Sequence, residues 1–206
     1  MTFSRRLTLA TLGAVAALST SAAIANVTTN DAAPDFTGTA TDGASVSLSD
    51  FAGKTVVLEW TNHGCPFVQK HYDASYANMQ PLQSNAASED VVWLTVISSA
   101  PGKQGHVSPT KADELTTSRG AAPSAVILDE SGDIGRLYGA KTTPHMYVVN
   151  AEGTLVYQGA IDSIRSSKTK DIPKATNYVT AALASVAAGT PVEKAQTKPY
   201  GCSVKY

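Results

Sequence analysis

The sequence holds two cysteines, Cys65 and Cys202, and these are the side chains best suited to redox chemistry. Cys65 follows a short apolar run and directly precedes Pro66, the first position of an expected helix. A helix N-terminus carries partial positive charge and unpaired N–H groups, and both favour a thiolate over a thiol. Such a position can lower a cysteine pKa from about 8.5 to between ~3.5 and ~7.5. We therefore predict that Cys65 is a nucleophile toward disulfides or peroxides, rather than a buried structural cysteine.

Cys202 lies near the C-terminus, between Pro199 and Gly201 on one side and Tyr206 on the other, in a segment typical of a flexible turn. Three interpretations are open. Cys202 can resolve an intermediate formed on Cys65, either in the same chain or in a partner subunit. It can also form a permanent disulfide, which for so long a loop would contribute roughly 4–5 kcal/mol in the chain-entropy model, or it can remain a free thiol. We favour the resolving role.

Two side chains that precede Cys65 are candidates for proton transfer. Glu59 lies inside an expected strand, where burial would raise the pKa of its carboxyl group and let it exchange a proton with a thiolate. Its alternative role is an ordinary strand glutamate that reaches solvent or pairs with a lysine. His63 lies in the following loop, where it can stabilise the thiolate as a cation or accept a proton as a base. Its alternative role is a solvated loop histidine.

The elements that would position these residues alternate along the chain. Short apolar runs predict buried strands, an alternating segment predicts an edge strand, and Asn150–Gly153 predicts the turn of a hairpin. The predicted strands are 44–48, 55–60, 91–97, 124–128, 146–149 and 155–158; the predicted helices are 66–72, about 74–86, one that starts at Ser108–Pro109, and roughly 174–188. This order of strands and helices predicts a three-layer α/β domain with a mixed sheet.

Two segments resemble the thioredoxin superfamily. VVLEWTNHGCP (Val56 to Pro66) is similar to its active-site segment, and YGAKTTPHMYVVNAEGTLVY (Tyr138 to Tyr157) is similar to its cis-proline segment and hairpin. APDF at 33–36 and LSDFAGK at 48–54 resemble the opening of the redoxin branch. That branch includes the alkyl hydroperoxide reductase and thiol-specific antioxidant proteins, which are peroxiredoxins, and exported thioredoxin-like proteins. The resemblance covers about residues 33–188.

The resemblance implies a thioredoxin-like fold with an N-terminal extension and a C-terminal tail. It implies that Pro144 is the cis-proline and that the backbone of Thr143 lies beside the reactive sulfur, where a substrate chain can pair with it. It places His145, as a proton donor or metal ligand, and Pro66 at the same substrate-binding surface. It also implies a buried acid at Glu59. No cofactor is expected.

The chain departs from a typical thioredoxin at the second active-site position. Thioredoxins carry two cysteines separated by two residues, whereas this chain has Val68 at the second position. Resolution within one turn of the helix is therefore impossible, and another group must attack the mixed disulfide or sulfenic acid. Cys202 is the natural candidate.

The chain also departs from the peroxiredoxins. They place a proline seven residues and a threonine or serine three residues before the reactive cysteine, where this chain has Leu58 and Asn62. Thr61 is one position away. They also place an arginine near the position of Pro144, which neither Arg119 nor Arg136 matches. Because the threonine and arginine hold the peroxide oxygens, these differences argue against efficient peroxide reduction.

Three functions are consistent with these residues. The first is thiol–disulfide exchange, in which Cys65 attacks, Cys202 resolves, and Glu59 or His63 transfers protons. The second is a peroxiredoxin-like antioxidant peroxidase that uses the same cysteines. The third is a metal carrier in which Cys65, His63, His145 and Cys202 bind copper(I) or zinc. The expected partners are protein thiols and disulfides or small peroxides, with an external reductant.

The N-terminal segment of the chain predicts export. The first 25 residues contain Arg5 and Arg6, an apolar stretch from Leu7 to Leu18, and a small-x-small site at Ala23–Ala25, which together indicate a signal peptide. The paired arginines leave both the general and the twin-arginine export routes open. The expected domain spans 26–190, and 191–206 form the tail with Cys202. Outside the cytoplasm a cysteine pair can persist as a disulfide.

Composition excludes other classes. The chain of 206 residues has a net charge of −1, with 43% hydrophobic residues, which suits one ordinary core. Basic residues are scattered, so no nucleic-acid partner is expected. No run of eighteen or more apolar residues follows the first segment, so no stable membrane insertion is expected after signal removal.

Overall fold

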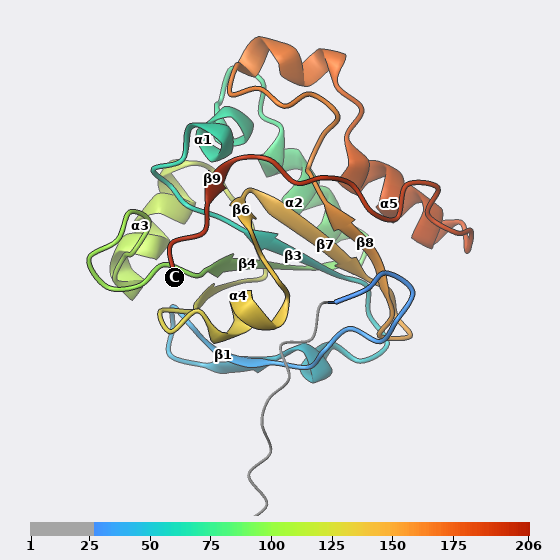
Figure 1. Cartoon of the computed structure of the whole chain (residues 1–206), viewed down its shortest axis with the longest axis horizontal. Coiled ribbons are helices and arrows are strands. Elements are labelled where there is room, and N and C mark those ends of the chain that lie inside the picture. The colour runs from blue at the N-terminus through green and yellow to red at the C-terminus, as the bar shows by residue number, and fades with distance from the viewer. Residues whose placement is uncertain (1–26) are drawn as a thin grey trace, which may run out of the picture.

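The computed structural model describes residues 27–206. It shows a three-layer α/β arrangement around one mixed sheet of seven strands, in the order β2-β1-β5-β4-β3-β7-β8, together with a small second sheet of β6 and β9 (Figure 1). The strands are β1 (Thr37–Ala40), β2 (Ser45–Ser47), β3 (Val56–Trp60), β4 (Val92–Ile97), β5 (Ala125–Leu128), β6 (Thr142–Thr143), β7 (His145–Val149), β8 (Leu155–Gly159) and β9 (Cys202–Ser203). The helices are η1 (Leu48–Phe51), α1 (Pro66–Tyr72), α2 (Met79–Ser88), α3 (Pro109–Ser118), α4 (Asp133–Leu137), η2 (Thr169–Lys174) and α5 (Tyr178–Ala187).

The centre of the main sheet consists of strands that are buried along their whole length. Every residue of β3, β4 and β7 is buried, which agrees with their nearly continuous apolar sequences. β3 pairs in parallel with β4, and β4 with β5, whereas β7 runs antiparallel to β3. The predicted mixed sheet is therefore confirmed. The loop that contains Cys65 leaves the sheet at the end of β3, which lies between β4 and β7.

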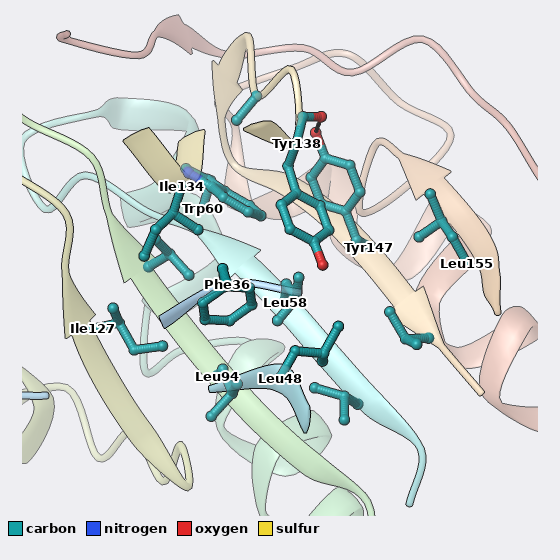
Figure 2. Packing of buried hydrophobic residues seen from close by; sticks show 14 of the residues in the cluster. Phe36, Leu48, Leu58, Trp60, Leu94, Ile127, Ile134, Tyr138, Tyr147 and Leu155 are labelled. Carbon is teal, nitrogen blue, oxygen red and sulfur yellow. Dashed lines mark hydrogen bonds between the residues drawn. The ribbon is translucent and has the colours of Figure 1, made fainter. Parts of the chain in front are cut away.

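The two faces of β3 contribute to two separate cores. Leu58 and Trp60 pack into a cluster with Phe36, Ile134 and other residues on the side of α4 (Figure 2). Val57 points to the other face, where residues of α1, α2 and α5 complete a second cluster. This second cluster includes Val68, Met79, Val179 and Cys65. The alternation of strand side chains between two faces thus produces the three layers.

Two predicted helices differ from the observed ones. The helix expected over 74–86 begins only at Met79, because Asp73 accepts a hydrogen bond from the backbone N–H of Ser75 at 2.9 Å and Ala77 has a positive φ of 38°. These features form a turn between α1 and α2. The helix expected over 174–188 is α5, which starts after Asn177. Its side chain accepts hydrogen bonds from the next turn and so caps the helix.

Several short elements are absent from the prediction. β1 has the sequence TGTA, in which small and polar residues give no apolar alternation. α4 has only five residues, and β6 and β9 have two residues each. Such elements are too short to carry a periodic signal. β6 and β9 form because each provides the hydrogen-bond partners of the other.

The tail, residues 191–206, packs along the domain. Its first contacts are with β8, where Gln158 donates a backbone hydrogen bond to Ala195 at 3.0 Å and accepts one from Thr197 at 3.0 Å. Its last contacts tie Val204 to Lys141 and other final residues to the end of β4. Figure 1 shows the tail running back from α5 past β6 to the side of α3. This path places Cys202 beside β6.

The predicted signal peptide, 1–25, lies outside the described residues. From residue 27 onward, no helix is both long enough and apolar enough to cross a membrane.

Candidate active site

Cys65 is the residue that directly precedes α1, and its side chain is fully buried. The loop that leads to it is fixed by the Asn62 side chain. That side chain accepts a hydrogen bond from the N–H of Gly64 at 2.9 Å and donates one to the carbonyl of Gln104 at 3.1 Å. The N–H of Cys65 itself donates to the carbonyl of Asn62 at 3.0 Å. The predicted nucleophile is thus held by these hydrogen bonds in a loop that follows β3.

The peptide bond between Thr143 and Pro144 is cis, which confirms the predicted cis-proline. This loop brings β6 beside α1, so that the Sγ atom of Cys65 lies 3.1 Å from the carbonyl oxygen of Thr143. Pro66 occupies the first turn of α1 on the other side of the sulfur. Four of the residues named from the sequence therefore meet here.

Cys202 completes the site from the tail. β9 pairs antiparallel with β6, and Cys202 is the register partner of Thr143. The Sγ atoms of Cys65 and Cys202 are 2.6 Å apart, and no disulfide joins the two cysteines. The tail approaches so closely because residue 201 is glycine. Gly201 has a φ of 143°, and a Cβ atom at this position would clash with the carbonyl oxygen of Thr143.

The two sulfurs have different proton affinities. Burial alone would raise the pKa of Cys65, yet its pKa is lowered because hydrogen bonds from Cys202 and from the N–H of Val68 stabilise its thiolate. Burial and the neighbouring Cys65 together raise the pKa of Cys202 to about 11. Of the two sulfurs, Cys65 therefore loses its proton more readily.

Glu59 lies on the same face of the sheet as α1 but does not reach the sulfurs. Its carboxylate accepts hydrogen bonds from Tyr72 at 2.8 Å, Trp93 at 2.9 Å and Gln83 at 3.2 Å. Complete burial raises its pKa, although these donors act in the opposite direction. In residues 27–206 no hydrogen bond joins Glu59 to Cys65 or Cys202. The predicted buried acid is present, but it contacts the end of α1 rather than the reactive group.

The two histidines named from the sequence also lie away from the sulfurs. The His63 ring lines a small cavity with Thr61, and its pKa is lowered by burial and by the charge of Arg119. His145 is buried, and its Nδ1 atom accepts a hydrogen bond from the N–H of Lys141 at 3.3 Å. Burial lowers the pKa of His145 to about 3, so its ring is neutral. Within the described chain neither ring is hydrogen-bonded to a cysteine.

The metal-carrier alternative requires these side chains to converge. Over residues 27–206 no group of three or more His, Cys, Asp and Glu side chains is arranged to hold a metal ion. The set of Cys65, His63, His145 and Cys202 is therefore not assembled into a metal site.

Sequence reasoning missed two residues that hold the site in shape, Gln104 and Gly201. Gln104 accepts the hydrogen bond of the Asn62 side chain, which orients the loop before Cys65, and Gly201 permits the contact with Thr143. The glycine directly before the only other cysteine was a usable signal, since a close backbone approach often requires glycine. Gln104 gave no signal, because its role depends on a contact between distant loops.

The donor role of Cys202 predicts a change in the titration of Cys65. In Cys202→Ala the pKa of Cys65 rises, because its thiolate loses a hydrogen-bond donor. The midpoint of the pH profile for alkylation by iodoacetamide measures this pKa. Cys202→Ser keeps an O–H donor and should raise the midpoint less. Equal midpoints in the wild type and Cys202→Ala would contradict this account.

The buried carboxyl group of Glu59 predicts a pH-dependent stability. Because its folded pKa lies above its ordinary value of 4.5, the folded state binds this proton more tightly than the unfolded state does. This contribution is fully present below pH 4.5 and is lost as the pH rises through the folded pKa. Relative to Glu59→Gln, the wild type should therefore lose free energy of unfolding over that range in denaturant titrations.

The control for the loss of a carboxylate is Glu89→Gln, whose side chain is exposed at the end of α2. If the difference in free energy of unfolding between the wild type and Glu59→Gln stays constant with pH, the raised pKa of Glu59 is contradicted.

Comparisons with known proteins agree with this geometry. An uncharacterised conserved protein from Geobacillus kaustophilus has a TM-score of 0.75 at 26% identity, over 87% of this chain and 92% of the other. A hypothetical protein from Sinorhizobium meliloti 1021 has a TM-score of 0.69 at 21% identity, over 88% and 96% of the two chains, which shows the shared fold. A Chlorobium tepidum protein assigned as a thiol:disulfide interchange protein DsbE has a TM-score of 0.51 at 25% identity, over 65% and 85%.

No curated protein matches this chain significantly. The Redoxin family profile, however, matches residues 28–178, which is most of the described chain. The fold, the cysteine at the start of α1 and the cis-proline opposite it are those of a thiol-based oxidoreductase with a thioredoxin-like fold. The chain belongs to the Redoxin family.

Proposed function

We propose that this protein is an exported thiol–disulfide oxidoreductase in which Cys65 attacks the substrate and Cys202 of the same chain resolves the intermediate. The observation that carries the proposal is the 2.6 Å contact between the two Sγ atoms, held by the pairing of β9 with β6. A disulfide bond is about 2.05 Å long, so the two sulfurs can bond with little movement of either backbone.

The reaction proceeds by two exchanges. The Cys65 thiolate attacks one sulfur of a substrate disulfide, forms a mixed disulfide, and releases the other substrate sulfur as a thiolate. Cys202 then loses its proton and attacks the Cys65 sulfur, which releases the second substrate thiolate. The substrate gains two electrons, and the protein loses two electrons as its two thiols become one disulfide. An external dithiol reductant returns the protein to its starting state.

The two cysteines differ in pKa and in exposure, and these differences indicate which sulfur the reductant attacks. Cys65 is fully buried, whereas Cys202 is partly exposed, so the Cys202 sulfur is the accessible end of the disulfide. Attack there releases Cys65, whose lowered pKa makes it the better leaving group. Regeneration therefore begins with a mixed disulfide on Cys202 and restores the Cys65 thiolate directly.

The burial of Cys65 also limits which substrates can reach it. β9 covers Cys65 and occupies the edge of β6, so a substrate disulfide reaches the nucleophile only when this part of the tail moves aside. The exposed edge at Thr142 and Thr143 then suits an extended polypeptide, which can pair with it as β9 does. Protein disulfides are therefore the substrates that this site fits best.

Peroxide reduction is less well supported by the site. Thr61 and Arg119, the nearest equivalents of the residues that would hold a peroxide, line the cavity beside His63. Neither residue is hydrogen-bonded to Cys65 in the described chain. A thiolate without those donors lacks stabilisation for the departing oxygen.

Oxidation in defined glutathione buffers tests the redox couple. Thiol trapping should reveal a reversible Cys65–Cys202 disulfide in the monomer, with a potential between about −120 and −270 mV. Cys65→Ala and Cys202→Ala should each abolish it. A bond that resists reduction below about −300 mV would make the disulfide structural, and thiols that never pair would remove the resolving role.

The same reduced protein, mixed with hydrogen peroxide in a stopped-flow instrument, should react slowly, because no peroxide-holding residues contact Cys65. A fast reaction that is lost in Cys65→Ala would favour a peroxidase instead.

Export is part of the proposal, and it rests on the first 25 residues and on the use of a cysteine pair. When the full chain is expressed with a C-terminal tag in a Gram-negative host, the protein should appear in the periplasm with Asn26 as its first residue. N-terminal sequencing measures the cleavage site. Replacement of Arg5 and Arg6 by lysine stops export only if the twin-arginine route is used. An uncleaved cytoplasmic protein would contradict export.

A further inference from the structure

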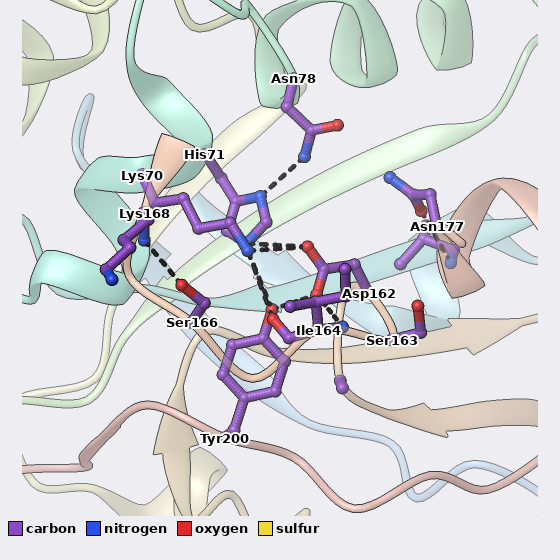
Figure 3. A network of polar contacts seen from close by, with 12 residues as sticks. Lys70, His71, Asn78, Asp162, Ser163, Ile164, Ser166, Lys168, Asn177 and Tyr200 are labelled. Carbon is purple, nitrogen blue, oxygen red and sulfur yellow. Dashed lines mark hydrogen bonds and ion pairs between the residues drawn. The ribbon is translucent and has the colours of Figure 1, made fainter. Parts of the chain in front are cut away.

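A buried polar cluster connects the tail to the helix that carries Cys65. Lys70 of α1 and Asp162, which follows β8, form an ion pair of 2.9 Å with side chains that are 0% and 4% exposed (Figure 3). Tyr200, two residues before Cys202, donates its hydroxyl hydrogen to the Oδ1 atom of Asp162. Lys70 also donates to the Tyr200 oxygen at 3.5 Å. The cluster plays no part in the exchange reactions above.

The other neighbours of Asp162 are a backbone N–H group and a histidine ring. The N–H of Ile164 donates to its Oδ1 atom at 3.0 Å. The Nε2 atom of His71 lies 3.8 Å from its Oδ2 atom, and burial lowers the pKa of His71 to about 4, so this ring is neutral. Asp162 is thus a buried carboxylate with a lysine as its cationic partner. It is a strong acceptor for the Tyr200 hydroxyl, because hydrogen bonds to ionised acceptors are stronger than neutral ones.

The tail has few other anchors near Cys202. Backbone bonds hold it to β8 at Ala195–Thr197 and to the domain again from Val204 onward. Between these two attachments, the span 198–203 is held by the two-residue pairing of β9 with β6. Over 191–206, Tyr200 alone is classed as buried, and it is 4% exposed. Its ring also packs edge-on against Phe67, the second residue of α1, with centroids 5.8 Å apart.

Lys198 and Pro199, the residues just before Tyr200, contribute less. Lys198 is exposed, and both residues border a surface hollow that is also lined by Arg165 and Tyr178. On the other side of Cys202, Ser203 is exposed as well. The side chain that ties this span to α1 is therefore that of Tyr200.

We infer that Tyr200 is a positioning residue that holds Cys202 on Cys65 through its bond to the buried Lys70–Asp162 pair. The inference rests on the proposed resolving role. The Tyr200 hydroxyl adds to the pairing of β9 with β6 in keeping the span closed, so that Cys202 attacks at a high effective concentration and Cys65 is shielded until the span opens. When the bond breaks, the tail remains attached at both of its outer ends, so the span opens without release of the tail.

Tyr200→Phe is the sharpest test, because it removes one oxygen and leaves both the contact with Phe67 and the Lys70–Asp162 pair in place. Loss of a hydrogen bond to a charged group should lower the effective concentration of Cys202 roughly tenfold. For this two-electron couple, that change makes the potential of the Cys65–Cys202 pair less negative by about 30 mV. In the reduced protein, alkylation of Cys65 should become roughly tenfold faster, as read from mass spectrometry of its peptide.

The matched control is Tyr206→Phe in the same tail. The Tyr206 hydroxyl also donates a hydrogen bond, to the carbonyl of Ala140 at 2.8 Å, but it lies beyond the outer attachment. This variant should keep the wild-type potential and alkylation rate. Tyr200→Ala also loses the packing on Phe67, so it should change both the potential and the alkylation rate more than Tyr200→Phe does. Denaturant titration of each reduced variant verifies that it is folded.

The two measurements separate this inference from the function on which it rests. A Tyr200→Phe protein that matches the wild type, or that changes no more than Tyr206→Phe, would overturn the positioning role. If the wild type forms no Cys65–Cys202 disulfide, the proposed function fails. The alkylation rates still show whether Tyr200 holds the span closed.

Discussion

The antiparallel pairing of β9 with β6 is the constraint on which the active site depends. Each strand has only two residues, yet the pairing places Cys202 opposite Thr143 and brings its sulfur to 2.6 Å from Cys65. It is possible because Gly201 has no side chain to collide with the carbonyl of Thr143. The cis-proline loop, the start of α1 and the tail therefore form one unit, and none of them makes the site alone.

This unit separates the roles of two chemically identical side chains. Donors from Cys202 and from α1 lower the pKa of Cys65, whereas burial and the neighbouring Cys65 raise that of Cys202. In the proposed exchange, the same asymmetry makes Cys65 the attacking sulfur and the better leaving group. A single arrangement of donors thus supports both halves of the proposed cycle. It does so without a second cysteine on α1, where Val68 instead packs into the core.

Two buried polar clusters fix the helix on which this chemistry depends. Glu59 of β3 accepts hydrogen bonds from Tyr72 at the end of α1, and Lys70 of α1 pairs with Asp162. Burying charged groups costs desolvation free energy, so such clusters contribute little net stability, and their effect is to favour one arrangement over others. The first cluster connects α1 to the sheet, and the second connects it to Asp162 and the tail. The orientation of Cys65 is therefore tied to both.

The sequence by itself determined the buried centre of the main sheet, the long elements around it and the candidate nucleophile. The apolar runs of β3 and β4, Pro66 at the start of α1 and the segment around Pro144 are local signals, because they reflect periodic burial and backbone restrictions that act over a few residues. The tertiary structure alone decided where the tail lies, that Glu59 and His63 stay away from the sulfurs, and that Tyr200 reaches Asp162. These outcomes depend on contacts between residues far apart in the chain, whose partners leave no mark on the local sequence pattern.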